Sequence, residues 1–295
     1  MIREIMHSIA ASLTLRRRAD PARPIDGPTA TEIVNLSAGV QGRAAQRSYS
    51  RDGLGARCNF IDAVKFRYRC AAADRLISRD NNPARELRKP PKQRSPRRPL
   101  TPAQLAEINK AAATTGVDPA LDTLILRLHT ETACRRGGSI ALRPCDLDTT
   151  QLTIRLREKG NTVRDQPVSP TLMTALVAHT QHRAPELDKT AQLLRHRNGT
   201  PIALAYSHQL WKKLGRRLPW VATLGVTSHW LRYTTLTWVE RNFGYAIAAA
   251  YAGHSQVSDR SGNTLTYVGA TIDEVATALA ALTGEPHPPA LTPPQ

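Results

Sequence analysis

The sequence predicts a mainly α-helical protein with a small antiparallel β-sheet, divided into two domains. Helix-start signals recur along the chain, with Ser, Thr or Asp standing before Pro or three residues before Gln or Glu. One segment alternates apolar and polar residues on both sides of a Lys159-Gly160-Asn161 turn, which is typical of a β-hairpin. A run rich in proline and basic residues separates the two parts of the chain.

The chain is strongly basic. Its 295 residues include 41 Lys and Arg against 24 Asp and Glu, which gives a formal net charge of +17. Such an excess attracts polyanions and favours nucleic acid as a partner, although an arginine-rich GC-biased genome would also raise it. Four cysteines without a Cys-x-x-Cys pair indicate reduced, buried thiols of a cytosolic protein rather than a zinc site or disulfides. No apolar run predicts a membrane span, and no secretory signal is expected.

Residues 1–84 are expected to form a small, basic helical domain without a complete-looking helical bundle. A short helix is predicted over 29–36 and a longer one over 56–77, where apolar residues follow helical spacing. The basic residues between them either face solvent or lie along a DNA backbone, where they neutralise phosphates. The predicted DNA contacts in this domain are Arg57, Lys65 and Arg69.

Residues 85–99 are expected to be an extended basic linker, because four prolines oppose helix formation there. Its charges suit a strap that closes around a duplex, and they equally suit a charged disordered linker. The predicted DNA contacts in this segment are Arg88, Lys89, Lys92, Arg94, Arg97 and Arg98.

The second domain, 100–283, begins at a capping box formed by Thr101 and Gln104. Asp118, Ser169 and Thr271 mark further helix starts. A helix over 208–218 carries two lysines that either bind phosphate or face water; these predicted DNA contacts are Lys212 and Lys213. Three histidines lack the carboxylate or cysteine spacing of a functional site and are predicted to lie on the surface: His179, His182 and His196. Residues 284–295 hold five prolines and are expected to be a disordered tail.

His229 and Arg232 stand three residues apart and therefore share one helix face, where they form a clamp for a phosphate. A Gly253-His254 pair follows, and Tyr267 comes thirteen residues after His254. Upstream lie an arginine in a turn and the hairpin lysine. Together, six residues in this order resemble the signature of the tyrosine recombinase (phage integrase) family: Arg135, Lys159, His229, Arg232, His254 and Tyr267.

The resemblance implies a tyrosine recombinase catalytic fold within a two-domain, C-shaped clamp around double-stranded DNA. It implies that Tyr267 is the nucleophile, that the two arginines hold the phosphate and that Lys159 protonates the leaving oxygen. His229 would assist proton transfer at the tyrosine, and His254 would donate to the phosphate. The implied protein needs no metal or cofactor and acts in the cytoplasm at the bacterial nucleoid. Its implied partners are identical chains in a tetramer joined through the C-terminal helix, and accessory DNA-bending or directionality proteins.

Two features depart from the family's pattern. The family usually carries an acidic residue three positions after its first arginine, where this chain has Gly138, and the loop 255–266 is longer than usual. Arg136, one residue out of register, is a second candidate for the first arginine. Three other tyrosines near the motif are expected to have packing roles: Tyr233, Tyr245 and Tyr251. The alternatives are a DNA-binding relative that no longer cuts, and a type IB topoisomerase-like enzyme that nicks and closes one strand.

Overall fold

The computed structural model describes residues 27–45, 52–91, 97–160, 162–186, 188–253 and 269–288. The chain divides into two compact units, Met1–Ser95 and Pro96–Gln295. Four of the residues selected from the sequence lie outside the described residues: Lys92, Arg94, His254 and Tyr267.

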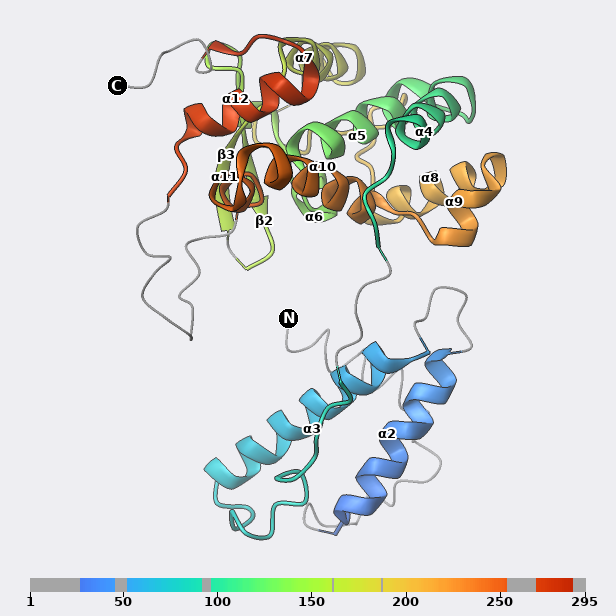
Figure 1. Cartoon of the computed structure of the whole chain (residues 1–295), viewed down its shortest axis with the longest axis vertical. Helices are drawn as coiled ribbons and strands as arrows, with labels where there is room; N and C mark the ends of the chain where they lie inside the picture. The colour runs from blue at the N-terminus through green and yellow to red at the C-terminus, as the bar shows by residue number, and fades with distance from the viewer. Residues whose placement is uncertain are drawn as a thin grey trace. The chain divides into compact units, whose positions relative to one another are not determined.

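The N-terminal unit is built on two packed helices, α2 (Ala30–Ala45) and α3 (Leu54–Ala73) (Figure 1). Ile61 and Tyr68 of α3 join Ile33 of α2 in a small buried core. Arg57 ties the two helices together, because its guanidinium donates to Ser37 and Gln41 of α2 at 3.2 Å each. Arg57, a predicted DNA contact, therefore has a structural role between the helices. The α2 helix is also longer than the segment 29–36 predicted from the sequence.

The second unit is mainly helical, and helices begin at the predicted caps Thr101, Asp118, Ser169 and Thr271, whereas the helix predicted over 208–218 begins four residues earlier, at Leu204. The side chains of Thr101, Asp118 and Ser169 each accept a hydrogen bond from a backbone N–H of the first helical turn. The long helices before the site are α4 (Pro102–Thr114), α5 (Pro119–Thr132), α7 (Pro170–Arg183) and α8 (Leu204–Arg217). They are followed by α9 (Pro219–Leu224), α10 (Ser228–Phe243), α11 (Tyr245–Tyr251) and α12 (Ile272–Thr283).

A three-stranded antiparallel sheet accompanies these helices, in the order β1 (Leu147–Asp148), β2 (Thr153–Glu158) and β3 (Thr162–Pro167). Strands β2 and β3 form the predicted hairpin and pair up to its tip, where Glu158 opposes Thr162. Ile154 and Leu156 point into the core, while Arg155 between them is exposed. The predicted fold class, mainly α with a small antiparallel sheet, is confirmed.

Two buried clusters position the site. The larger one joins α4, α5, α7 and α8 to the sheet, with Leu128 and Leu156 at its centre. The smaller one gathers Val239, Tyr251 and Leu279, from α10, α11 and α12, around Ala133 at the end of α5. Helix α12 therefore packs on its own unit in the single chain, against α11 and β3 (Figure 1).

Several predictions about exposure are wrong. All four cysteines are free thiols, but only Cys134 is buried, whereas Cys70 and Cys145 are exposed. His179 is buried on the inner side of α7, where its Nε2 accepts a hydrogen bond from the backbone N–H of Arg195 at 3.1 Å. The partner of His179 is a backbone N–H, which leaves no side-chain spacing in the sequence that would indicate burial.

The first residues of the predicted disordered tail make hydrogen bonds and an ion pair with the second unit. Glu285 accepts a hydrogen bond from the backbone N–H of Thr171 at 3.1 Å and pairs with Arg127 at 3.0 Å. The buried His287 ring donates to the carbonyl of Leu152 at 3.0 Å. Proline content indicated disorder for this segment, but these two polar side chains anchor residues 284–288 to the second unit. Within the described ranges, the helices lack the combination of length and apolar character that a membrane-spanning segment needs.

Candidate active site

Arg135 stands directly before α6 (Arg136–Ile140), the short helix that follows α5. Its guanidinium pairs with the carboxylate of Glu158, on β2, at 2.8 Å, and its backbone N–H donates to the other oxygen of the same carboxylate. The Glu158 side chain is 0% exposed, while the Arg135 side chain keeps 34% of its surface exposed. The guanidinium is therefore anchored on its inner side and open to solvent on its outer side.

Arg232, on α10, links the segments that precede Arg135 and His254. Its buried guanidinium donates to the carbonyl of Ala133 and, at 2.7 Å, to the carbonyl of Ala252. Ala133 ends α5 with φ 48°, a left-handed conformation that a residue with a side chain rarely adopts and that clusters at functional sites. Burial lowers the pKa of Arg232 to about 10, so the group stays cationic at neutral pH.

His229 lies one turn before Arg232 on α10, and its ring is partly exposed. Partial burial, followed by the positive charges of Arg97, Arg232 and Arg135, lowers the pKa of this imidazole below its ordinary value. Three of the predicted catalytic residues thus share one electrostatic environment. A histidine held neutral in this way can accept a proton at neutral pH.

Lys159 is exposed at the tip of the β2–β3 hairpin, next to Gly160 with φ 83°. Lys159 directly follows the buried Glu158, the last residue of β2, and lies in the turn that leads to β3. The lysine therefore extends from the same strand end that anchors Arg135.

Gly253 occupies a tight turn just after α11. Its φ of 64° is left-handed, and a Cβ atom there would collide with the side chain of Arg164. Arg164, from β3, is almost buried; it donates to the carbonyl of Thr132 at 3.0 Å and approaches Glu158 at 3.8 Å. Both the turn and the arginine beneath it therefore require glycine, immediately before the predicted His254.

Two residues of the site were not predicted from the sequence. Glu158 pairs with Arg135, and Arg164 approaches Glu158 and packs against the turn at Gly253. One signal was present for Glu158: the chain lacks an acidic residue at position 138 but has one directly before the hairpin lysine. Arg164 carried no comparable signal, since basic residues alternate along the whole hairpin.

The tyrosines near the motif differ from one another. Tyr251 is fully buried and its hydroxyl donates to the carbonyl of Glu131, as expected for a packing role. Tyr233 and Tyr245 are 39% and 54% exposed, so the packing roles predicted for them are wrong. Each lies on the solvent side of its helix, a side that sequence spacing alone did not identify.

Several predicted DNA contacts have partners within the protein. The Lys213 ammonium pairs with the buried carboxylate of Asp122, and Lys89 pairs with Asp62 at 2.6 Å. Lys213 is thereby held by α5, which the sequence did not foresee because Asp122 lies far from it along the chain. Four other predicted contacts have exposed side chains: Arg69, Arg88, Arg98 and Lys212. Lys65 and Arg88 line one surface hollow of the N-terminal unit, and Arg97 is half-buried near His229.

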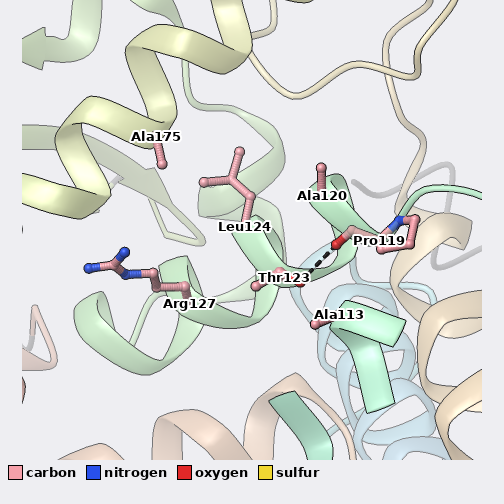
Figure 2. Close-up of a pocket in the computed structure, with 7 residues that line it drawn as sticks. All are labelled: Ala113, Pro119, Ala120, Thr123, Leu124, Arg127 and Ala175. Atoms are coloured by element: carbon pink, nitrogen blue, oxygen red, sulfur yellow. Dashed lines mark hydrogen bonds between the residues drawn. The ribbon is translucent and has the colours of Figure 1, made fainter. Parts of the chain in front are cut away.

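A separate hollow of about 340 Å³ opens beside α5, between α4 and α7 (Figure 2). Its lining is mostly apolar, with Leu124 from α5 and Ala175 from α7, and Thr123 donates to the carbonyl of Pro119 at 2.7 Å. The one ionisable lining residue, Arg127, already pairs with Glu131 and Glu285. Of the predicted catalytic residues that the structure describes, none lines this hollow, so the hollow is treated separately from the candidate site.

A model of the phage integrase family matches residues 98–262 of this chain. A search with this chain found no match among curated protein sequences. Among solved structures, a lambda integrase tetramer bound to a Holliday junction superposes with a TM-score of 0.64 at 16% identity, covering 88% of this chain and 74% of that one.

The Tn1549 transposon integrase is similar as well. Its complex with a circular intermediate DNA gives a TM-score of 0.63 at 19% identity, with 85% of this chain and 86% of that chain covered. Its complex with transposon right end DNA gives 0.63 at 18% identity, with 95% and 94% covered. At such identities the likeness shows the fold alone, mainly helical with a small antiparallel sheet.

Proposed function

The chain belongs to the phage integrase family, and we propose that it is a site-specific DNA recombinase. It would cut and rejoin duplex DNA without a metal ion, through a 3′-phosphotyrosyl intermediate. The observation that supports this most strongly is the joint position of Arg135, Arg232 and His229: two cations and a neutral base in one environment, drawn from segments far apart in the sequence.

In the proposed reaction the hydroxyl of Tyr267 attacks the phosphorus of one DNA strand. The bond between the tyrosine oxygen and phosphorus forms, the bond to the 5′ oxygen breaks, and Lys159 gives a proton to that departing oxygen. His229 assists removal of the tyrosine proton. The reverse attack by a 5′ hydroxyl from another strand releases the tyrosine, so the energy of the phosphodiester is retained throughout.

The two arginines would stabilise the extra negative charge that develops on the phosphate oxygens. The exposed side of Arg135 leaves part of its guanidinium available to an oxygen, while its inner side is held by Glu158. Arg232 is held by two carbonyls, so its orientation is set before the substrate arrives. Fixed cations of this kind need no reorganisation during the reaction. His254 would add a further donor to the phosphate.

The proposed partner is double-stranded DNA, held between a core-binding domain (1–84), a basic linker (85–99) and the catalytic domain (100–283). We extend the proposal to a tetramer joined through α12, since the lambda integrase relative is a tetramer on a Holliday junction. In that assembly α12 would exchange its contacts with its own unit for equivalent contacts with a neighbour. Accessory DNA-bending or directionality proteins and a place at the bacterial nucleoid complete the proposal.

Covalent trapping tests the proposed chemistry. The protein is incubated with nicked suicide duplexes taken from the DNA that flanks its gene, and the products are separated on a denaturing gel. We expect a protease-sensitive adduct that Tyr267→Phe abolishes while DNA affinity is kept. Tyr233→Phe and Tyr245→Phe are matched controls, because both remove exposed hydroxyls near the motif. An adduct that survives in Tyr267→Phe would refute this nucleophile.

The same experiment separates the alternatives. Salt-dependent binding without any adduct would indicate a relative that no longer cuts. Adduct formation and plasmid relaxation without joint products would indicate the topoisomerase-like activity. Binding to the duplex should weaken with salt by a slope of about −0.9 in log K per neutralised phosphate, and a flat response would contradict the proposed DNA clamp.

A further inference from the structure

Position 138 is a glycine for a reason that lies in another part of the chain. Gly138 has an ordinary helical backbone within α6, so its conformation alone does not require glycine. A Cβ atom there would lie 3.0 Å from Cγ and 3.1 Å from Oε1 of Glu158. At the neighbouring Gly137 a Cβ atom would meet nothing within 4 Å. A side chain at 138 would therefore crowd the Glu158 side chain and displace it by a few tenths of an ångström from its position against Arg135.

The Glu158 carboxylate uses both oxygens on Arg135. One oxygen accepts from the backbone N–H of Arg135 and the other from its guanidinium, while Arg164 lies 3.8 Å from the second oxygen. A carboxylate without exposed surface is costly unless it is paired, so its preferred position is set by these cations. Glu158 thus holds both the backbone and the side chain of Arg135.

We propose that Glu158 is the positioning residue for Arg135, and that it supplies from strand β2 the acidic side chain that family members usually carry at the position of Gly138. The inference rests on the proposed function, because Arg135 is a catalytic arginine only if the protein cuts DNA. In this chain the glycine and the glutamate form a coupled pair, each suited to the other.

The hairpin also connects this pair to the general acid. Glu158 and Lys159 are adjacent, with one side chain buried against Arg135 and the other exposed at the tip. An acid at position 138 would orient Arg135 from α6, the helix that Arg135 precedes. Glu158 instead joins the β2–β3 hairpin to Arg135. Movement of the hairpin on DNA binding would therefore shift Arg135 and Lys159 together.

A reciprocal exchange tests the coupling. Glu158→Ser removes the carboxylate and makes room, Gly138→Asp supplies a carboxylate from α6, and the double variant combines them. The readout is the single-turnover rate of adduct formation at saturating DNA, measured together with the dissociation constant. We expect roughly a hundredfold loss of rate in Glu158→Ser, a comparable loss in Gly138→Asp, and recovery of at least about tenfold over Glu158→Ser in the double variant.

Gly137→Asp combined with Glu158→Ser is the matched control. It places the same acid one residue away, in open space, and should recover nothing. All variants should bind the duplex within about threefold of the unmodified protein, since a positioning residue affects the rate more than the ground-state affinity. A double variant no faster than Glu158→Ser alone, or equal recovery by the Gly137 control, would overturn the proposal.

A second readout is independent of DNA cleavage. The melting temperatures of Glu158→Gln, Arg135→Gln and the double variant form a cycle. If the two residues hold each other, Glu158→Gln should lower the melting temperature by more than about 4 °C alone and by much less in the Arg135→Gln background. Additive shifts would refute the pairing. An unmodified protein that forms no adduct but shows this coupling would count against the recombinase proposal and leave the pairing intact.

Discussion

Two arginine–carboxylate pairs in the second unit use the same chemistry to different ends. Arg183 forms two parallel bonds with Asp118, at 2.5 and 2.8 Å, and a further one with the carbonyl of Arg195 at 3.2 Å. The side chains of both partners are nearly buried: that of Arg183 is 10% exposed and that of Asp118 is 8% exposed. Arg135 pairs with a fully buried carboxylate through one guanidinium nitrogen and its backbone N–H, and keeps a third of its side chain exposed.

The difference concerns what remains of each cation after pairing. The Arg183 guanidinium bonds only to groups within the protein in the described residues, and it joins the start of α5 to the end of α7. It also holds the pKa of the Asp118 carboxyl below its ordinary value. Arg135 retains an exposed side that can meet an anion. A buried acid therefore joins two elements of the fold in one case, and in the other it fixes a guanidinium that remains partly exposed to solvent.

Removing the exposed cation should have the largest effect on the proposed reaction. We expect Arg135→Gln to slow adduct formation by roughly 10²- to 10³-fold, the usual cost of losing one fixed donor to a transition state. Single-turnover trapping measures this rate. Arg136→Gln is the control, since Arg136 is the next residue, is exposed, and was the second candidate from the sequence. A loss confined to Arg136→Gln would move the assignment by one residue.

Removing the buried cation should instead affect stability. Arg183→Gln leaves the Asp118 carboxylate without its main partner, and we expect the free energy of unfolding to fall by about 3 kcal/mol. Urea unfolding measures this loss. The folded fraction of the variant should form adduct at the rate of the unmodified protein. A slowed reaction in fully folded Arg183→Gln would show that the two pairs are not functionally separate.

The surroundings of the structural pair also make stability depend on pH. Burial, and then the positive charge of Arg183, lowers the pKa of His179 to about 4. Below its unfolded pKa of about 6.5 the unfolded chain binds the proton that the folded protein excludes, so stability falls as the pH drops toward 4. Between pH 7 and pH 5 this histidine should account for a loss of about 2 kcal/mol. Urea unfolding at both values, compared with His179→Gln, isolates its contribution; an unchanged slope in the variant would contradict this.

An exposed pair on the hairpin should have the smallest effect. Arg155 and Asp165 face each other across β2 and β3 at 2.9 Å, with 55% and 45% of their side chains exposed. Solvent screens such a pair, so Arg155→Gln should leave both the unfolding midpoint and the adduct rate unchanged within error. A large change in either quantity would show that the sheet's outer face takes part in binding or folding.

The fold was largely predictable because its signals are local. Thr101 with Gln104, Asp118 and Ser169 each start a helix through contacts within one turn, and alternation predicted the β2–β3 hairpin. The exposure of particular side chains was less predictable. His179 and Lys213 find partners that are distant in sequence, and a single-residue pattern carries no record of them.

The candidate site divides in the same way. The sequence alone determined the residue types and their order, because Arg135, Lys159, His229 and Arg232 belong to recognisable local motifs. Only the tertiary structure decided what holds them: Glu158 reaches Arg135 from another strand, and Arg232 bonds to Ala133 and Ala252 from a separate helix. The physical reason is that a buried charge needs a partner in space, and the identity of that partner emerges only when packing brings distant segments together.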